Sequence, residues 1–369
     1  MKISSTARYA LVISAAAILA ACNGGGSVSS ALSPTALNAA QVGLHRNGSL
    51  HLRMVPSLAA KSVAVMHPDH RKSWVSPDAK RAPRLLFISD YGADDVNIYT
   101  MPAMVLKGSL TGFTTPEGMC SDTSGNIWIS DTGAQQMELF SRTGTLLKTL
   151  SVPNEFPASC AVNKTNGDLA VGNIEDATGS AGNIEIFHNA TGTGTPYTNG
   201  NIFEYFFVGY DPSGNLFFDG TDSSRAISYL GELPAGSSNT ETISLSGGTL
   251  HLAGFIQWYN AGNYLALGDQ MCGGTTASCV YWVTVSGSTA TITGTTNLSN
   301  SQGGAVCDLV QGVIAANGEK YLAGPDYEGT CASGTSTAYR WAFDAGGTPT
   351  NFNNSSSLAE PIGAAVSTK

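Results

Sequence analysis

Six carboxyl or amide side chains recur through the chain at intervals of 41 to 57 residues, each at or just past the end of a short apolar run. They are Asp90, Asp131, Asn173, Asp219, Asp269 and Asp326. A circle of such oxygens would suit a hard cation such as Ca²⁺. Asp and Asn at strand ends also commonly bond the backbone of their own turn. The sequence leaves both readings open, a ligand-binding face and a set of turn residues.

Three glutamates lie on or beside other apolar runs and are the candidate metal ligands: Glu117, Glu204 and Glu360. Two carboxylates at one site are costly unless something binds between them. Nucleophilic catalysis has less support, because His188 and His251 are the only histidines after residue 84 and neither has a sequence cue for a serine partner. We therefore predict no catalytic residue.

Six cysteines remain beyond residue 22, an even number typical of disulfides in an oxidising compartment: Cys120, Cys160, Cys272, Cys279, Cys307 and Cys331. Locality favours the pairs Cys120–Cys160, Cys272–Cys279 and Cys307–Cys331, although fifteen pairings are formally possible. Zinc is the alternative, but six residues separate Cys272 from Cys279, rather than the two to four typical of zinc ligands.

A seventh cysteine, Cys22, ends the most specific motif of the chain. Lys2 and Arg8 precede the apolar run Ala10–Leu19, which is too short to span a bilayer. The following Leu-Ala-Ala-Cys resembles the lipobox of bacterial lipoproteins, which implies removal of residues 1–21 and lipid on Cys22. Asn23 resembles an outer-membrane sorting signal if the host is Gram-negative. The alternative is an ordinary secretory peptide.

Residues 22–83 read as a tether. They open with Asn-Gly-Gly-Gly-Ser and continue through Ser-, Ala- and Pro-rich sequence, and residues 24–84 carry eight Lys and Arg against two Asp, a net charge of +6. Such composition predicts a mostly disordered, lipid-anchored basic segment.

The elements that would position these side chains are seen most clearly in residues 116–150. Four short runs, Gly118–Ser121, Asn126–Ser130, Met137–Ser141 and Thr145–Leu150, are separated by turn residues and predict a four-stranded antiparallel meander. The pattern returns at 85–110, 157–198, 203–245, 250–298 and 303–353. Six repeats of this length predict an all-β, six-bladed β-propeller over residues 84–369.

The C-terminus would close this ring. Residues 360–367 are similar to the start of the 116–150 unit, and the first unit lacks an inner strand. We expect the C-terminal strand to supply it, which removes exposed sheet edges and makes Glu117 and Glu360 neighbours. The same arrangement would put all six cysteines on one face, where the ligand-binding loops are expected.

The repeated turn and strand residues resemble NHL-type repeats and the gluconolactonase-like six-bladed propellers. That family implies a metal held by Glu, Asn and Asp at the starts of inner strands. Glu117 matches the Glu position, whereas Gln257 and Ala305-Val306-Cys307 depart from the later ones.

Charge limits the partners. Residues 85–369 hold eight Lys and Arg against 25 Asp and Glu, a net charge of −17, which excludes nucleic acid as a partner of the folded part. We expect a monomeric, lipid-anchored cell-envelope module that binds a protein or glycan on its disulfide-bearing face. The alternative is a Ca²⁺-type metal-dependent hydrolase or lactonase.

Overall fold

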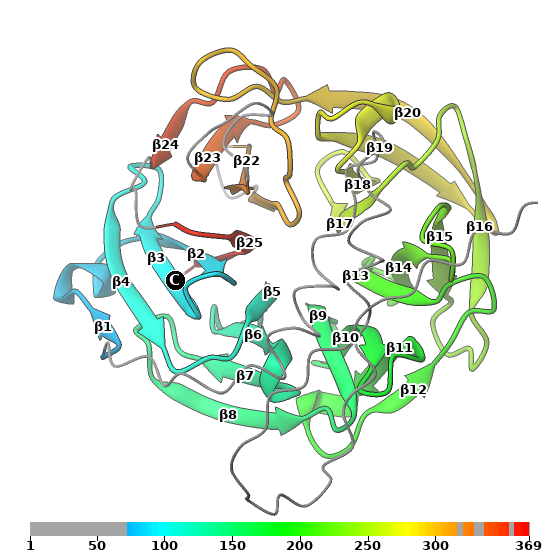
Figure 1. Ribbon diagram of the computed structural model, residues 1–369, viewed down its shortest axis with the longest axis horizontal. Helices are drawn as coiled ribbons and strands as arrows, with labels where there is room; N and C mark the ends of the chain where they lie inside the picture. The colour runs from blue at the N-terminus through cyan, green and yellow to red at the C-terminus, as the bar shows by residue number, and fades with distance from the viewer. Residues whose placement is uncertain (1–71, 316–319, 328–335, 354–357, 369) are drawn as a thin grey trace, which may run out of the picture. The chain divides into compact units, whose positions relative to one another are not determined.

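The computed structural model describes residues 72–315, 320–327, 336–353 and 358–368. In this part of the chain the regular structure is β-strand, together with four short 3-10 helices. The strands stand in sheets around a common centre, with outer strands such as β8 and β16 at the rim (Figure 1). The helices are η2 (Pro77–Lys80), η3 (Thr132–Ala134), η4 (His188–Ala190) and η5 (Cys272–Gly274).

Five sheets account for the described strands, and most paired strands are antiparallel and consecutive along the chain. The first has the order β1 (Trp74–Val75), β4 (Leu106–Thr111), β3 (Asp95–Thr100), β2 (Arg84–Asp90), β25 (Pro361–Thr368). The second contains β5 (Pro116–Ser121), β6 (Ile127–Asp131), β7 (Gln136–Phe140) and β8 (Leu146–Ser151). The third contains β9 (Glu155–Val162), β10 (Leu169–Asp176), β11 (Ala181–Phe187) and β12 (Thr195–Tyr197).

The fourth sheet has eight strands. Its first half is β13 (Glu204–Tyr210), β14 (Leu216–Thr221), β15 (Ser228–Leu233) and β16 (Glu241–Ser246), and its second half is β17 (Ala253–Tyr259), β18 (Tyr264–Asp269), β19 (Cys279–Ser286) and β20 (Thr289–Asn297). The outer strands β16 and β20 pair in parallel and join the halves. The two units predicted here, residues 203–245 and 250–298, are joined at their outer strands into one sheet. The fifth sheet contains β21 (Val313–Ala315), β22 (Tyr321–Asp326), β23 (Thr337–Ala342) and β24 (Asn351–Asn353).

The innermost strands form a closed circle of neighbours. Contacts run from β25 to β5, β9, β13, β17 and β21, and back to β25. The C-terminal strand β25 pairs antiparallel with β2, from Arg84 opposite Thr368 to Asp90 opposite Pro361. The expected closure by the C-terminus is confirmed.

Two glycines allow adjacent inner strands to lie close together. A Cβ atom added at Gly363 would lie 2.2 Å from the Glu117 carbonyl oxygen, and one added at Gly118 would lie 2.4 Å from the Ala158 carbonyl oxygen. Any larger residue would force the strands apart, so the packing of β25, β5 and β9 requires glycine at these positions.

The turns between first and second strands show why the sequence repeats. In the turn after β5, Asp122 Oδ1 accepts hydrogen bonds from the backbone N–H groups of Ser124 and Asn126, both at 2.8 Å. The turn after β13 has the same arrangement around Asp211. These Asx-type turns fix the Asp-x-Ser-Gly-Asn pattern, with Gly125 and Gly214 at positive φ.

The structure differs from the sequence-based prediction at two other places. In the predicted unit 303–353 the first described strand is the short β21, and residues 306–311 approach it without strand structure. Ordered structure also begins before residue 84, because β1 pairs with β4. The signal sequence, Cys22 and the tether up to residue 71 lie outside the described residues, as does Cys331.

Candidate functional site

Five of the six recurring carboxyl and amide groups accept hydrogen bonds from the backbone of an inner strand or of the segment that leads into it. Asp90 shows the arrangement: its Oδ2 accepts a hydrogen bond from the Ala359 N–H at 2.7 Å, and its Oδ1 accepts one from the Glu360 N–H at 2.8 Å. Both donors directly precede β25. The buried carboxylate at the end of a second strand therefore fixes the start of its neighbouring inner strand.

Related contacts recur around the ring, before the inner strand in most cases and within β13 for Asp219. Asp131 accepts from Thr114 N at 2.7 Å, Asp219 from Phe207 N at 2.9 Å, Asp269 from Leu252 N at 3.0 Å and Asp326 from Cys307 N at 3.3 Å. Asp90 and Asp269 also accept hydrogen bonds from their own turns, through Ala93 N and Met271 N. These five carboxylates have a structural role shared between two strands, whereas the sequence had suggested a ligand-binding face or bonds within their own turns.

Asn173 is the exception. It is fully buried, and its side-chain Nδ2 donates to Asn183 Oδ1 on the adjacent strand at 2.8 Å. Its own oxygen, Oδ1, has no hydrogen-bond partner among the described residues. Asn173 therefore lies in the predicted series by position and differs from it in its contacts.

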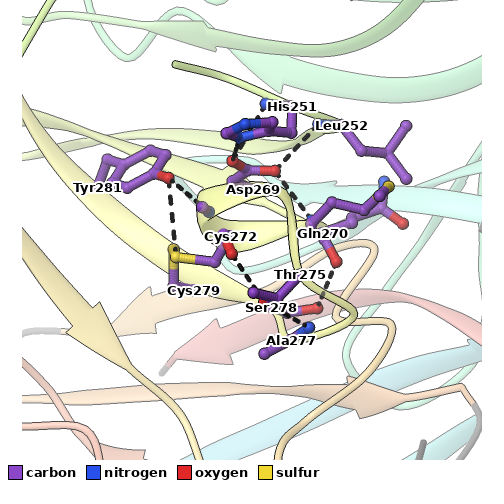
Figure 2. Close-up of a disulfide and its surroundings, with 12 residues drawn as sticks. His251, Leu252, Asp269, Gln270, Cys272, Thr275, Ala277, Ser278, Cys279 and Tyr281 are labelled. Carbon is purple, nitrogen blue, oxygen red and sulfur yellow. Dashed lines mark hydrogen bonds and ion pairs between the residues drawn. A yellow bond between two sulfur atoms is a disulfide. The ribbon is translucent and has the colours of Figure 1, made fainter. Parts of the chain in front are cut away.

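Figure 2 shows Asp269 beside the Cys272–Cys279 disulfide, which forms as expected with Cα atoms 5.5 Å apart. The bond closes a short loop in which Gly273–Thr276 are exposed and Ser278 is buried. Ser278 Oγ donates to the Cys307 carbonyl oxygen at 2.9 Å and accepts from Leu309 N at 3.1 Å. The disulfide loop thereby holds the non-strand segment that leads to β21.

The Cys120–Cys160 disulfide also forms as expected, between β5 and β9. Its position contradicts the prediction that all six cysteines share one face. Cys120 pairs with Trp128 and Cys160 with Val171, both near the starts of the second strands, whereas Cys272 follows the end of one. The two disulfides thus lie toward opposite ends of their sheets. The third expected pair includes Cys331, so it stays a prediction.

Glu117, the candidate metal ligand at the Glu position of the gluconolactonase-like propellers, is completely buried on β5. Neither of its carboxylate oxygens has a hydrogen-bond partner among the described residues, and burial raises its pKa well above the ordinary value. Glu360 is partly exposed, and its Cγ lies 2.8 Å from where a Cβ at Gly92 would be. The structure gives these two glutamates separate surroundings.

Glu204 takes part in an ion-pair group. Arg225 Nε lies 2.5 Å from Glu204 Oε1, and Arg225 Nη2 lies 2.6 Å from Glu175 Oε1. Thr221 Oγ1 donates to the other Glu204 oxygen at 3.0 Å. Burial raises the pKa of Glu204 to about 7 although Arg225 favours the ionised form. The group links β10 to the start of β13.

Apolar side chains pack together between the inner strands. One hydrophobic cluster contains buried side chains from successive inner strands and their approaches, among them Ala158, Phe206, Phe255, Leu309 and Ile362. The aromatic residues of β13 and β17 thus pack within the core.

Gln311 is a polar residue between the inner strands that sequence reasoning missed. Its Oε1 accepts hydrogen bonds from Met119 N at 2.9 Å and Ala364 N at 3.0 Å, and its Nε2 donates to the Met119 carbonyl oxygen at 2.9 Å. It therefore joins the approach to β21 to both β5 and β25. No local pattern marks a glutamine for this role.

The expected metal ligands differ in their contacts. Glu117 is isolated on β5, Glu204 is paired with Arg225, and in the described ranges no three His, Cys, Asp or Glu side chains form a group suited to a metal ion. In the same ranges no helix is long and apolar enough to cross a membrane.

Comparison with known proteins places the chain in a class. It is similar to a chain in the crystal structure of a nidogen/laminin complex, with a TM-score of 0.55 and 10% identity over 77% of this chain and 98% of that one. It is also similar to a protein of unknown function from Bacteroides caccae, with a TM-score of 0.56 and 12% identity over 78% of this chain and all of that one. Together with the closed circle of sheets, these likenesses define a β-propeller-type fold. No protein-family model and no curated protein matches the chain.

Buried acids give the fold a pH dependence. Burial, with the charges of nearby Glu138 and Asp94, raises the pKa of Asp131 to about 7, and burial with the charges of Glu185 and Asp176 raises that of Glu155 to about 7. A carboxyl whose pKa is raised on folding stabilises the fold below its ordinary pKa, and this contribution is lost as pH rises through about 7. In metal-free buffer we expect a higher melting temperature at pH 5 than at pH 8.

Thermal melts at half-unit pH steps check this expectation. Glu155→Gln should flatten the profile between pH 5 and 8, whereas Asp78→Asn, a change on an exposed carboxylate, should leave it unchanged. A protein that melts higher at pH 8 than at pH 5 would show that burial of these acids does not govern its stability.

Proposed function

We propose that the chain is a six-bladed propeller, anchored by lipid on Cys22 to the cell envelope, that acts as a non-catalytic binding or scaffold module. Six blades follow when each half of the eight-stranded sheet is counted as one. In a Gram-negative host the anchor would lie in the outer membrane. The basic tether of residues 22–83 would link anchor and propeller.

The hydrogen bonds of the recurring carboxylates support the non-catalytic part of the proposal. Five of them are occupied by backbone N–H groups, and apolar side chains pack together between the inner strands. We therefore assign ligand binding to exposed loops. The loop from Gly273 to Thr276 is exposed, held at its base by a disulfide, and next to the partly exposed ring of His251. A rigidly held exposed loop suits recognition of a protein or glycan.

Binding assays on envelope proteins and glycan arrays test this proposal. Thr275→Ala with Thr276→Ala should abolish capture of the ligand that the unchanged propeller retains. Lys164→Ala, an exposed change in the turn between β9 and β10, is the matched control and should keep full binding. Equal binding by all three proteins would contradict a binding role for the loop.

A metal-dependent hydrolase or lactonase is the second candidate, because Glu117 is buried without a partner among the described residues and matches the family's Glu position. It would be favoured if the purified protein hydrolysed lactones in the presence of Ca²⁺ and Glu117→Gln abolished that activity. Hydrolysis at the buffer rate would eliminate it.

The anchor has its own test. Cys22→Ser removes the thiol that would carry the lipid, so we expect the protein to leave the membrane fraction or to remain uncut. Fractionation of cells and mass spectrometry of the N-terminus measure both outcomes. A substituted protein that stays in the membrane and is cut normally would contradict lipidation at this site.

A further inference from the structure

Four polar side chains lie on one face of the sheet β9–β12. Asn173 on β10 is paired in register with Asn183 on β11, and Glu185 follows two residues later on the same face. Asn183 Nδ2 donates to Glu155 Oε1, from the start of β9, at 2.6 Å. With the bond from Asn173 to Asn183, a continuous chain of contacts crosses three strands.

This group contains three buried oxygens that accept nothing from the described residues. They are Asn173 Oδ1, Glu155 Oε2 and Glu185 Oε2. Asn173 is fully buried, so its amide oxygen has no access to bulk water. A buried acceptor without a donor costs about 1–3 kcal/mol, and more when it is charged. Three such acceptors on one face indicate that a hydrogen-bond donor or a cation binds there.

The surroundings favour a cation. The negative charges of Glu185 and Asp176 act on Glu155, and no ion pair among the described residues includes Glu155 or Glu185. Arg225 contacts this sheet through Glu175 of β10 and also pairs with Glu204, and the Lys148 Nζ donates to the Ala190 carbonyl oxygen at 3.0 Å. The carboxylates of Glu155 and Glu185 are thus left without a basic partner among the described residues.

We propose that Glu155, Glu185 and the amide oxygen of Asn173 bind a divalent cation, Ca²⁺ in preference to Mg²⁺. Carboxylate and amide oxygens are the ligands Ca²⁺ takes, and its flexible shell of six to eight oxygens is completed by water. Mg²⁺ requires near-ideal octahedral geometry and gives up water reluctantly. This site is separate from Glu117 and does not depend on the function proposed above.

Its place in the fold indicates what it does. The sheet face that carries Asn173 also carries Val171, which packs in one hydrophobic cluster with Trp128 and Met137 of the preceding sheet. Thr132 Oγ1 links the two sheets by donating to the Pro157 carbonyl oxygen at 2.6 Å. A cation beside this interface would neutralise the glutamates and stabilise the contact between sheets.

Thermal melts of the full-length, metal-stripped protein in detergent at pH 7.5 test the proposal. Calcium at about ten times its dissociation constant should raise the melting temperature by about 2–5 °C. MgCl₂ at equal ionic strength should raise it much less. No shift with CaCl₂ up to 10 mM, or an equal shift with MgCl₂, would overturn the assignment.

Substitutions separate this site from general effects of calcium. Glu155→Gln and Glu185→Gln should each abolish the calcium shift, and in chelator they should melt at or above the unchanged protein because a buried charge is removed. Glu232→Gln, a change in another glutamate of raised pKa, should keep the shift. A calcium shift that persists in both site variants would refute the site, as would its loss in the Glu232 control alone.

Discussion

Removal of residues 358–369 is expected to unfold or severely destabilise the propeller. The deletion takes away β25, the inner strand of the first sheet, and leaves the edge of β2 unpaired. Burial of Ile362 and Val366 alone is worth about 3–6 kcal/mol, at 1.5–3 each. This is a large part of the 5–15 kcal/mol that typically stabilises a folded domain.

Calorimetry of the truncated protein should show a melting temperature lower by at least about 10 °C, or no cooperative transition. Deletion of Lys369 alone is the control and should have little effect. A synthetic peptide of residues 358–369 should restore the transition, whereas a scrambled peptide should not. Truncated protein that melts within about 2 °C of the full chain would show that the ring does not need this strand.

Replacement of Gln311 by alanine is expected to cost about 2–5 kcal/mol, because the N–H groups of Met119 and Ala364 lose their buried acceptor. Both belong to inner strands that face the ring centre and have no alternative partner strand on that side. Few single side chains in the molecule satisfy backbone groups on two other strands.

Denaturant titration measures this loss directly as a change in the free energy of unfolding. Gln302→Ala, at an exposed position, provides the matched control and should be within about 0.5 kcal/mol of the unchanged protein. Hydrogen exchange should show faster exchange at Met119 and Ala364 in the Gln311 variant. Unchanged protection there would mean that the side chain does not hold the two strands.

The sequence predicts the local parts of the fold because local chemistry determines them. In the Asp-x-Ser-Gly turns after β5 and β13, the Asp side chain accepts a hydrogen bond from the backbone two residues later. The pattern is therefore recognisable in the sequence itself. Closure by β25 was also predictable, because its residues repeat the start of β5.

Contacts between distant segments were not predictable in the same way. Gln311 meets Met119 across 192 positions, and β16 pairs with β20 although both look like ordinary outer strands. The positions of Asp90 and Asp269 were predictable because they recur with the repeat. Their hydrogen-bond partners were not, because the closed circle of sheets brings those partners close. Cys120 was assigned to the wrong face because the β-bulge between Pro116 and Met119 and the strand length were not visible in the sequence.

The parallel pairing of β16 with β20 has a consequence for how the molecule comes apart. Elsewhere adjacent units are held mainly by side-chain packing, and opening one leaves the hydrogen-bonded ladder of the next intact. Residues 204–297 form one hydrogen-bonded sheet. Loss of either half therefore leaves the outer strand of the other half without its partner on that edge. This segment should therefore unfold as one cooperative foldon roughly twice the size of its neighbours, and partial openings of the ring should begin away from it.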